Sequence, residues 1–230
     1  MKRMRTYFQL FFFSLLAFTV GCSRTGDDVV VNPGLRASVL ISAADLAQQL
    51  NNPNYQIIDI AQIPEEYAEG HIAGALFVDW RMDITDPAVP DLFNLPPQAM
   101  YEGLMDRLGV TPDTTVVLYD NFNSRFATRV FWTMRYYGHN TIKILDGGRG
   151  AWLAAGFDIS TEAPVVEPSD YRVSTINAEL LAEMPFIKSQ LTADGFKLLD
   201  GRPHAQYTGE APGKVYHTGT EHAARGHIYG

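Results

Sequence analysis

The sequence contains very little cysteine, since Cys22 is the only one among 230 residues. No disulfide can therefore form within the chain, and a cysteine-based metal site is excluded. A thiol for catalysis is also missing from every position after Cys22. Basic residues are few as well, because 18 Lys and Arg stand against 26 Asp and Glu, a formal net charge of −8. Without a basic stripe that could follow phosphates, the sequence argues against a nucleic-acid partner.

Long apolar runs are absent except near the N-terminus. Residues 6–20 are almost uncharged and apolar, follow a short cationic head, and precede Gly21-Cys22-Ser23. This run is too short to span a bilayer comfortably and is typical of an export signal. Because Cys22 stands where a bacterial lipobox carries its lipidated cysteine, we predict lipid attachment there. The protein would then be exported and lipid-anchored at a bacterial membrane, facing the periplasm or the cell exterior; simple secretion is the alternative.

The rest of the sequence has the composition of a globular protein. Its apolar share of 46% and aromatic share of 12% exclude a disordered chain. Short apolar runs alternate with amphipathic stretches, which favours buried parallel strands joined by helices. The predicted fold class is therefore α/β, with a doubly wound parallel sheet. Strands are expected at 56–60, 76–78, 115–119, 141–145 and 197–200, and helices at 42–50, 97–108, 126–137, 149–155 and from 177 onward.

One local passage occurs twice, with similar residue types in the same order. The first copy consists of Ile57-Ile58-Asp59, Tyr67 and Gly70-His71-Ile72, and the second of Leu198-Leu199-Asp200, Tyr207 and Gly226-His227-Ile228. Internal self-similarity of this kind indicates two similar domains. We predict that the second is present only as a beginning, since little sequence follows His227.

Four segments carry a resemblance to a known family. They are Ile58-Asp59 with Glu66-Tyr67, Gly70-His71-Ile72-Ala73-Gly74-Ala75, Val117-Leu118-Tyr119-Asp120 and Leu145-Asp146-Gly147-Gly148-Arg149-Gly150-Ala151-Trp152. Together they resemble the rhodanese family of thiosulfate and 3-mercaptopyruvate sulfurtransferases, in its tandem two-domain form. The resemblance implies an inactive N-terminal domain and a C-terminal domain that bears the nucleophilic cysteine. It also implies ping-pong transfer of sulfur through a cysteine persulfide.

The repeat and the resemblance divide the chain into five parts. They are a lipoprotein-type signal peptide over 1–21, a tether over 22–37, a non-catalytic rhodanese-like domain over 38–158, a linker over 159–176, and the truncated start of a second rhodanese-like domain over 177–230. The interval from His71 to Asp120 is 120 − 71 = 49 positions, so the corresponding loop after His227 is expected near position 276. We expect residues 177–230 to fold marginally and to expose apolar side chains, namely Phe186, Ile187, Leu198 and Leu199.

The first copy has an acidic residue where a sulfurtransferase needs a thiol. Such an enzyme requires a thiolate at the carboxyl end of a parallel strand, where backbone N–H groups can face the anionic sulfur. In this chain the matching position after the predicted strand 115–119 is Asp120. A carboxylate cannot carry sulfur and would repel thiosulfate. We therefore predict no catalytic residue in this chain, with Asp120 in the place of the nucleophile.

Two pairs of charged residues are candidate pocket or structural residues. Arg125 and Arg129 lie one helical turn apart at the start of a predicted helix, where cations are unfavourable. Pairing with Asp120 is the favoured interpretation, and a relic anion pocket or an interdomain contact is the alternative. Asp200 and Arg202 form an Asp-x-Arg pattern of rhodanese domains, which is expected to brace the domain or to help line a pocket.

Histidine and glycine clusters do not point to a metal or a cofactor. His71 and His227 are interpreted as buried or capping residues rather than catalytic ones. The four histidines of the C-terminal region, at positions 204, 217, 222 and 227, fit no metal-ligand spacing, and no cysteine supports them. The glycines at 147, 148 and 150 form neither glycine-rich nucleotide fingerprint. We predict no metal and no cofactor.

Two functions remain open. The first is an exported, lipid-anchored sulfurtransferase whose catalytic cysteine loop is missing from this sequence, so that the chain alone is inactive. Its partners would be a small sulfur-containing anion, if the complete enzyme exists, and the membrane. The alternative is a non-catalytic rhodanese-like lipoprotein that serves as a binding or scaffold protein. A phosphatase relative on the same kind of fold would need the same absent cysteine.

Overall fold

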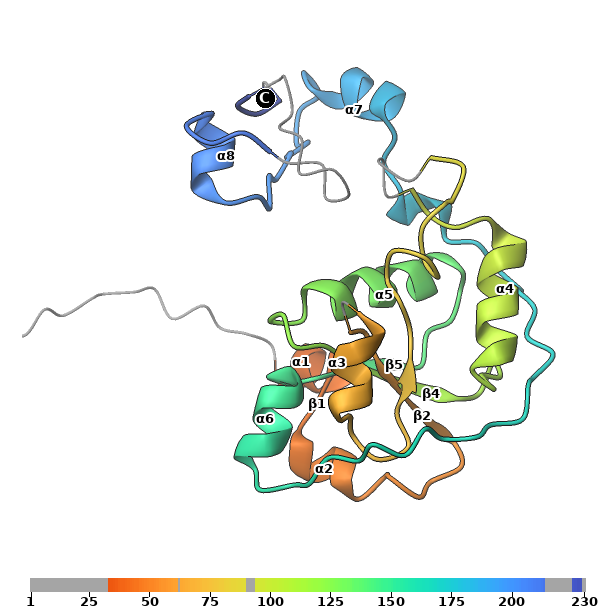
Figure 1. The fold of residues 1–230 in the computed structure, drawn as a ribbon. Coiled ribbons are helices and arrows are strands. Elements are labelled where there is room, and N and C mark those ends of the chain that lie inside the picture. The colour runs from red at the N-terminus through yellow and green to blue at the C-terminus, as the bar shows by residue number, and fades with distance from the viewer. Residues whose placement is uncertain (1–32, 62, 90–93, 214–224, 229–230) are drawn as a thin grey trace, which may run out of the picture. The chain divides into compact units, whose positions relative to one another are not determined.

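A parallel sheet of five short strands organises the protein. The computed structural model describes residues 33–61, 63–89, 94–213 and 225–228 (Figure 1). The strands are β1 (Leu40–Ile41), β2 (Tyr55–Asp59), β3 (Leu76–Phe77), β4 (Thr115–Tyr119) and β5 (Ile142–Leu145), in the spatial order β1-β5-β4-β2-β3. All neighbouring strands run parallel. The predicted doubly wound sheet is confirmed, and four of its strands lie within a residue of their predicted bounds.

Helices cover both faces of this sheet. They are α1 (Pro33–Val39), α2 (Ala43–Ala47), α3 (Pro64–Glu69), α4 (Gln98–Arg107), α5 (Arg125–Tyr136) and α6 (Gly148–Ala154). Successive residues of a strand point to opposite faces. Ile58 and Leu118 therefore pack with residues of α4 and α5, whereas Ile57 and Val117 pack with residues of α2 and α6. The hydrophobic core is thus two layers, one on each side of β2 and β4.

The segment predicted as a linker lies against the helices α4 and α5. Asp106 of α4 accepts hydrogen bonds from the backbone N–H groups of Ser169 and Tyr171, through its carbonyl and its carboxylate respectively. Further along, Asn177 donates its backbone N–H to the carbonyl of Tyr136 at 2.8 Å. At Gly138, which ends α5 with a φ of +79°, a Cβ would overlap the carbonyl oxygen of Thr175. Hydrogen bonds therefore hold this segment to α4 and α5 at several points, and Tyr171 is buried, although most of the other residues of the segment are exposed.

The C-terminal region forms short helices and no strand among its described residues. It contains a 3-10 turn, η2 (Ala178–Leu180), and the helices α7 (Met184–Gln190) and α8 (His204–Thr208). The helix predicted from 177 onward is therefore a single turn followed by a separate helix, and the strand predicted at 197–200 is wrong. An isolated apolar run cannot form a strand without a neighbour to accept its backbone hydrogen bonds.

The exposure expected of this region is found for two of its apolar side chains. Phe186 is 52% exposed and Leu199 is 89% exposed, whereas Leu198 and Ile187 are half-buried. Marginal folding of residues 177–230 stays a prediction. The predicted signal peptide, Cys22 and most of the predicted tether lie outside the described residues. In the part of the chain that the structure describes, no helix has both the length and the apolar character needed to cross a bilayer.

Candidate functional site

The loop between β4 and α5 places a carboxylate inside a ring of backbone N–H groups. Asp120 follows β4 directly and is 2% exposed. Its Oδ1 accepts from Phe122 at 2.8 Å and Ser124 at 2.9 Å, and its Oδ2 accepts from Phe126 at 2.8 Å and Ala127 at 2.9 Å. We call these four N–H groups the Asp120 nest. Charge-assisted hydrogen bonds and the positive end of α5 together stabilise a negative charge at this point.

Two features fix the shape of this loop. Asn123 and Ser124 have φ angles of 54° and 61°, a left-handed conformation that non-glycine residues adopt rarely. On the other side, Gly148 approaches so closely that a Cβ there would overlap the carbonyl oxygen of Asp120. Arg149 donates its backbone N–H to the same carbonyl at 3.4 Å. The loop after β5 therefore supports the loop after β4.

A hollow of about 380 Å³ opens between these two loops, at the carboxyl ends of the strands. Its polar lining includes Asn121, Asn123 and Arg149, together with Asp120 itself. In parallel α/β sheets this edge is where ligands bind. These four N–H groups already donate hydrogen bonds to the Asp120 carboxylate. They are therefore not free to bind an anion from outside the chain.

Arg125 and Arg129 both belong to the first turns of α5, as predicted. The guanidinium of Arg129 lies over the ring of Trp132, 4.9 Å from its centre, and burial lowers the pKa of Arg129. The pairing of either arginine with Asp120 stays a prediction. The sequence places Asp120 where backbone N–H groups can face an anionic group, but it does not indicate which N–H groups bind the carboxylate.

A second buried carboxylate lies one strand away. Asp59 ends β2 and is 1% exposed, and its Oδ2 accepts the hydroxyl of Tyr119 at 2.6 Å. The Tyr119 oxygen accepts the backbone N–H of Ile72 at 3.0 Å. Burial raises the pKa of Asp59 to about 6, although the Tyr119 hydrogen bond and the charge of Arg149 act in the opposite direction. Asp59 thus has a structural hydrogen-bonding role.

We expect Tyr119→Phe to destabilise the protein by about 2 kcal/mol, because it leaves Ile72 N–H and Asp59 Oδ2 buried without this partner. Urea denaturation followed by circular dichroism would measure the change. Tyr55→Phe is the matched control, since Tyr55 lies on β2 and the described structure shows no hydrogen bond from its hydroxyl. If the two variants were equally stable, the hydrogen bonds that link Tyr119 to Asp59 and Ile72 would not contribute to stability as we expect.

Both copies of the repeat build the same tyrosine–histidine pair. His71 stacks on Tyr67 with ring centres 3.9 Å apart, and its Nδ1 lies 3.0 Å from the Tyr67 carbonyl oxygen. His227 stacks on Tyr207 at 3.9 Å, with its Nδ1 2.9 Å from the Tyr207 carbonyl oxygen. The Nε2 of His71 also lies 3.0 Å from the carbonyl oxygen of Glu162. His71 is fully buried, as predicted, but His227 is exposed.

Asp200 and Arg202 are brought together as the Asp-x-Arg pattern predicts. The Nε of Arg202 donates to both carboxylate oxygens, at 2.9 and 3.0 Å, and its Nη2 donates to the Gly226 carbonyl at 2.9 Å. These Arg202 hydrogen bonds lower the pKa of Asp200 to about 2. Arg202 therefore braces the two parts of the second copy, and both residues line a separate hollow.

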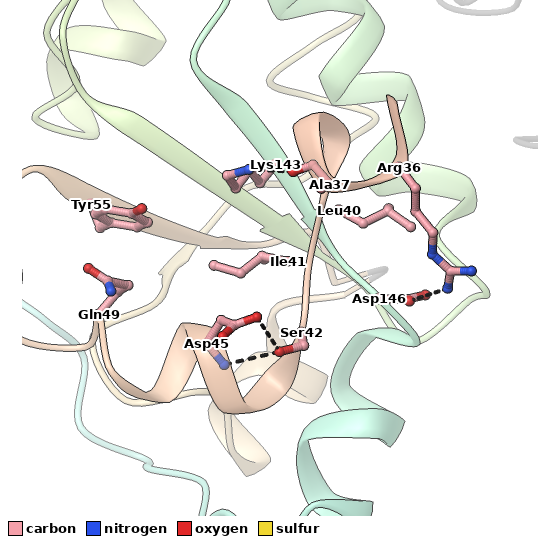
Figure 2. Close-up of a pocket in the computed structure, with 10 residues that line it drawn as sticks. All are labelled: Arg36, Ala37, Leu40, Ile41, Ser42, Asp45, Gln49, Tyr55, Lys143 and Asp146. Carbon is pink, nitrogen blue, oxygen red and sulfur yellow. Dashed lines mark hydrogen bonds and ion pairs between the residues drawn. The ribbon is translucent and has the colours of Figure 1, made fainter. Parts of the chain in front are cut away.

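Other candidate sites are less informative. Within the described ranges, no group of three or more His, Cys, Asp or Glu is arranged to hold a metal ion; His217 and His222 lie outside these ranges. A hollow of about 480 Å³ beside β1 is lined by charged groups that already interact with the chain (Figure 2). There Arg36 pairs with Asp146 at 2.6 Å, and Lys143 donates to the Ala37 carbonyl at 3.0 Å.

Sequence reasoning found the position of Asp120 but missed Tyr119 and Arg149. Tyr119 was interpreted only as a strand residue, because nothing in an apolar run shows that its hydroxyl bonds to two other segments. Arg149 did carry a signal: it follows a glycine pair just beyond a predicted strand that neighbours 115–119. Loops that follow adjacent parallel strands meet at one edge of the sheet, so this arginine could have been placed beside Asp120.

The fold is that of a small α/β domain with a parallel sheet, and the loop at the carboxyl end of β4 surrounds the Asp120 carboxylate with four backbone N–H donors. The rhodanese-like domain family matches residues 42–155. The chain is also 30% identical over 197 residues to a putative thiosulfate sulfurtransferase of Mycobacterium tuberculosis (strain ATCC 25618 / H37Rv), covering 85% of this chain and 69% of that protein. This chain belongs to the rhodanese-like family.

Other relatives agree with this assignment. The sulfur carrier protein TtuD of Thermus thermophilus is 36% identical over 135 residues, which cover 59% of this chain and 46% of that protein. The 3-mercaptopyruvate sulfotransferase SseA of Escherichia coli has a similar structure, with a TM-score of 0.72 and 26% identity, covering 84% of this chain and 73% of SseA. Thiosulfate sulfurtransferase of Rattus norvegicus is 31% identical, and the match covers 62% of its length. The chain thus spans about half to two thirds of several curated relatives.

Proposed function

We propose that this chain supplies the supporting, non-catalytic domain of a rhodanese-type sulfurtransferase. The complete enzyme would move sulfur from thiosulfate or 3-mercaptopyruvate to a thiophilic acceptor through a cysteine persulfide. The observation that carries this proposal is the Asp120 carboxylate, which occupies a backbone nest suited to an anionic nucleophile. No cysteine follows position 22 to replace it, so the chain alone is inactive.

The proposal includes a second rhodanese-like domain that begins within residues 177–230. The repeated tyrosine–histidine pair supports this assignment, because two separate sequence passages build the same local geometry. The greater length of the curated relatives supports it as well. On this proposal the catalytic loop lies near position 276, and the described domain forms one wall of the substrate cleft.

The proposal also places the protein outside the cytoplasm, on a lipid anchor. The support is the apolar run over 6–20 followed by the lone Cys22. The thiol would carry a lipid, which leaves it unavailable for sulfur transfer. The substrate would be a small sulfur-containing anion, and the membrane would be contacted through the lipid.

Purified full-length protein with Cys22→Ser is expected to form no thiocyanate from thiosulfate and cyanide above the uncatalysed rate. The physical reason is that sulfur transfer needs a thiolate to accept the sulfane sulfur, and the Asp120 carboxylate cannot do so. A colorimetric thiocyanate assay, with a known thiosulfate sulfurtransferase as positive control, would measure this. Enzymatic turnover by this variant would refute the non-catalytic assignment.

A second candidate function is a rhodanese-like binding or scaffold lipoprotein, which the self-occupied nest also favours. The coding sequence beyond codon 230 separates the two. A cysteine codon near position 276, followed by a glycine-rich loop with arginine, supports the enzyme. A stop followed by unrelated sequence supports the scaffold.

A further inference from the structure

The guanidinium of Arg149 has no acceptor within the described part of the chain. Arg149 lies in the first turn of α6 and is half-buried. Its side chain makes no hydrogen bond and no ion pair with any residue that the structure describes. An arginine side chain carries five N–H donors and stays charged in proteins. A half-buried guanidinium without an acceptor is therefore suited to an anion from outside the chain.

Two further donors line the same hollow of about 380 Å³. Arg149 comes from the loop after β5, whereas Asn121 and Asn123 come from the loop after β4. Among the described residues, neither of these two side-chain amides has a hydrogen-bond partner. Asp120 is the one acidic residue in the described lining, and it is 2% exposed. The four N–H groups of the Asp120 nest compensate much of its negative charge.

The second copy of the repeat shows an arginine whose donors are fully engaged. There the Nε of Arg202 donates to both oxygens of Asp200, and its Nη2 donates to the Gly226 carbonyl. In the first copy Gly70 corresponds to Gly226, and the Nη2 of Arg149 lies 3.6 Å from the position that a Cβ on Gly70 would take. Arg149 is thus close to the equivalent place but makes none of these hydrogen bonds, so its donors stay available.

The Asp59 carboxylate attracts Arg149 from inside the domain. The charge of Arg149 lowers the pKa of Asp59, although the two side chains form no ion pair. Tyr119 and His71 also lower this pKa, and Asp120 raises it. Because burial is the largest effect and raises the pKa of Asp59 to about 6, Asp59 is mostly charged at pH 7 and mostly neutral at pH 5. A charged Asp59 competes with an outside anion for the guanidinium.

We propose that this hollow binds a small sulfur oxyanion through the Arg149 guanidinium, with the Asn121 and Asn123 amides as further donors and Asp59 as an internal competitor. The inference rests on the proposed function for the choice of anion, since that reaction consumes thiosulfate and releases sulfite. A guanidinium presents two parallel N–H groups to two oxygens of such an anion. The rhodanese-like domain then holds the anion without reacting with it, because Asp120 offers no thiol.

The parent protein for the test is the full-length chain with Cys22→Ser, titrated with sodium thiosulfate at an ionic strength held constant with sodium chloride. We expect saturable binding by isothermal titration calorimetry, with a dissociation constant on the order of 1 mM. Amide chemical shifts in NMR spectra should change at residues 120–124 and 147–151. Sodium sulfite, titrated in the same way, should bind to the same residues.

Three variants of the parent protein identify the groups that bind the anion. Arg149→Gln should weaken thiosulfate binding by at least about tenfold, because the charged donor is lost. Arg172→Gln is the matched control: it removes the same charge from an exposed side chain that pairs with Asp170, and affinity should be unchanged. Leu153→Glu alters no donor, but places a carboxylate on the rim of the hollow and should weaken binding at least about threefold.

The proposal fails if thiosulfate shows no saturable binding. It also fails if Arg149→Gln and Leu153→Glu bind thiosulfate as the parent protein does. Should Arg149→Gln not fold, as judged by its NMR spectrum, Leu153→Glu alone decides.

Competition by Asp59 is tested through pH. Thiosulfate keeps both of its charges between pH 5 and pH 7, and its affinity should be at least about threefold higher at pH 5, where Asp59 is neutral. Asp59→Asn should make the affinity equal at the two pH values. A pH-independent affinity in the parent protein, or a pH dependence that persists in Asp59→Asn, would overturn the competition. These readouts measure binding, whereas the proposed function fails through turnover, so the two failures are distinguishable.

Discussion

Asp120→Cys, made together with Cys22→Ser, is expected to give this chain a reactive thiolate. The Asp120 nest and the N-terminus of α5 stabilise a negative charge at this position. Thiols in such environments have pKa values of roughly 3.5–7.5, compared with about 8.5 for a free cysteine. We expect the new thiol to titrate in that lower range, and the pH dependence of its alkylation by iodoacetamide would measure it.

The same variant is expected to accept sulfur. The thiolate would attack the outer sulfur of thiosulfate, so that a new sulfur–sulfur bond forms and sulfite leaves with the electron pair of the broken bond. One equivalent of sulfite should be released per chain, and the mass of the protein should rise by one sulfur atom. We therefore expect the Asp120→Cys variant to carry one persulfide per chain, whereas the unmodified protein carries none.

Two matched variants define what counts as success for Asp120→Cys. Asp120→Ser tests whether the loop survives loss of the carboxylate, because it has the size of cysteine without the thiol. Asn140→Cys provides an exposed thiol away from the loop. If the thiol introduced by Asp120→Cys titrates no lower than the one introduced by Asn140→Cys while the Asp120→Ser variant folds, the nest does not stabilise an anionic nucleophile.

The parts of the fold that follow from sequence are those decided by continuous local patterns. Residues 116–119 form an uninterrupted apolar and aromatic run, and this pattern alone indicates a strand that is buried on both faces. The same reasoning failed at 197–200, where the apolar pair Leu198-Leu199, flanked by Lys197 and Asp200, stays outside any strand. An apolar run shows that a segment can form a strand, but the neighbouring strand decides whether it does.

The candidate site, like the fold, has one part that could be predicted from the sequence and another that could not. The position of Asp120 could be predicted, because it only requires knowing where β4 ends. The nest could not, since it depends on left-handed backbone at Asn123 and Ser124, two residue types that occur in many conformations. The close approach of Gly148 to the Asp120 carbonyl is a contact between segments far apart in sequence, which local patterns do not report.

A comparison of the two copies of the repeat explains why the Asp59 carboxylate is buried without a cationic partner. In the second copy Arg202 stands two positions after Asp200 and hydrogen-bonds its carboxylate. The first copy has Ala61 at the equivalent position, and Ala61 is 2% exposed. Asp59 is therefore buried without the guanidinium that Asp200 has, and its Oδ1 has no hydrogen-bond partner among the described residues.

This difference makes the stability of the rhodanese-like domain depend on pH through Asp59. Burial raises the pKa of Asp59 from 3.8 to about 6 in the folded protein. The folded state therefore holds this proton more tightly than the unfolded state does. Its contribution is fully present below about pH 4 and is lost as the pH rises to about 6, which amounts to up to about 3 kcal/mol.

Asp59→Asn is expected to remove this pH dependence, because asparagine stays neutral and can still accept the Tyr119 hydroxyl. Relative to the unmodified protein, the variant should gain up to about 3 kcal/mol of unfolding free energy between pH 4 and pH 7. Its amide nitrogen lacks a partner, which costs about 1–3 kcal/mol equally at every pH. Urea denaturation at pH 4, 5, 6 and 7 would give the difference curve, with Asp113→Asn as an exposed control for the loss of one charge. If the unfolding free energy of the Asp59→Asn variant and that of the unmodified protein changed equally with pH, Asp59 would not be the group that loses its proton between pH 4 and pH 7.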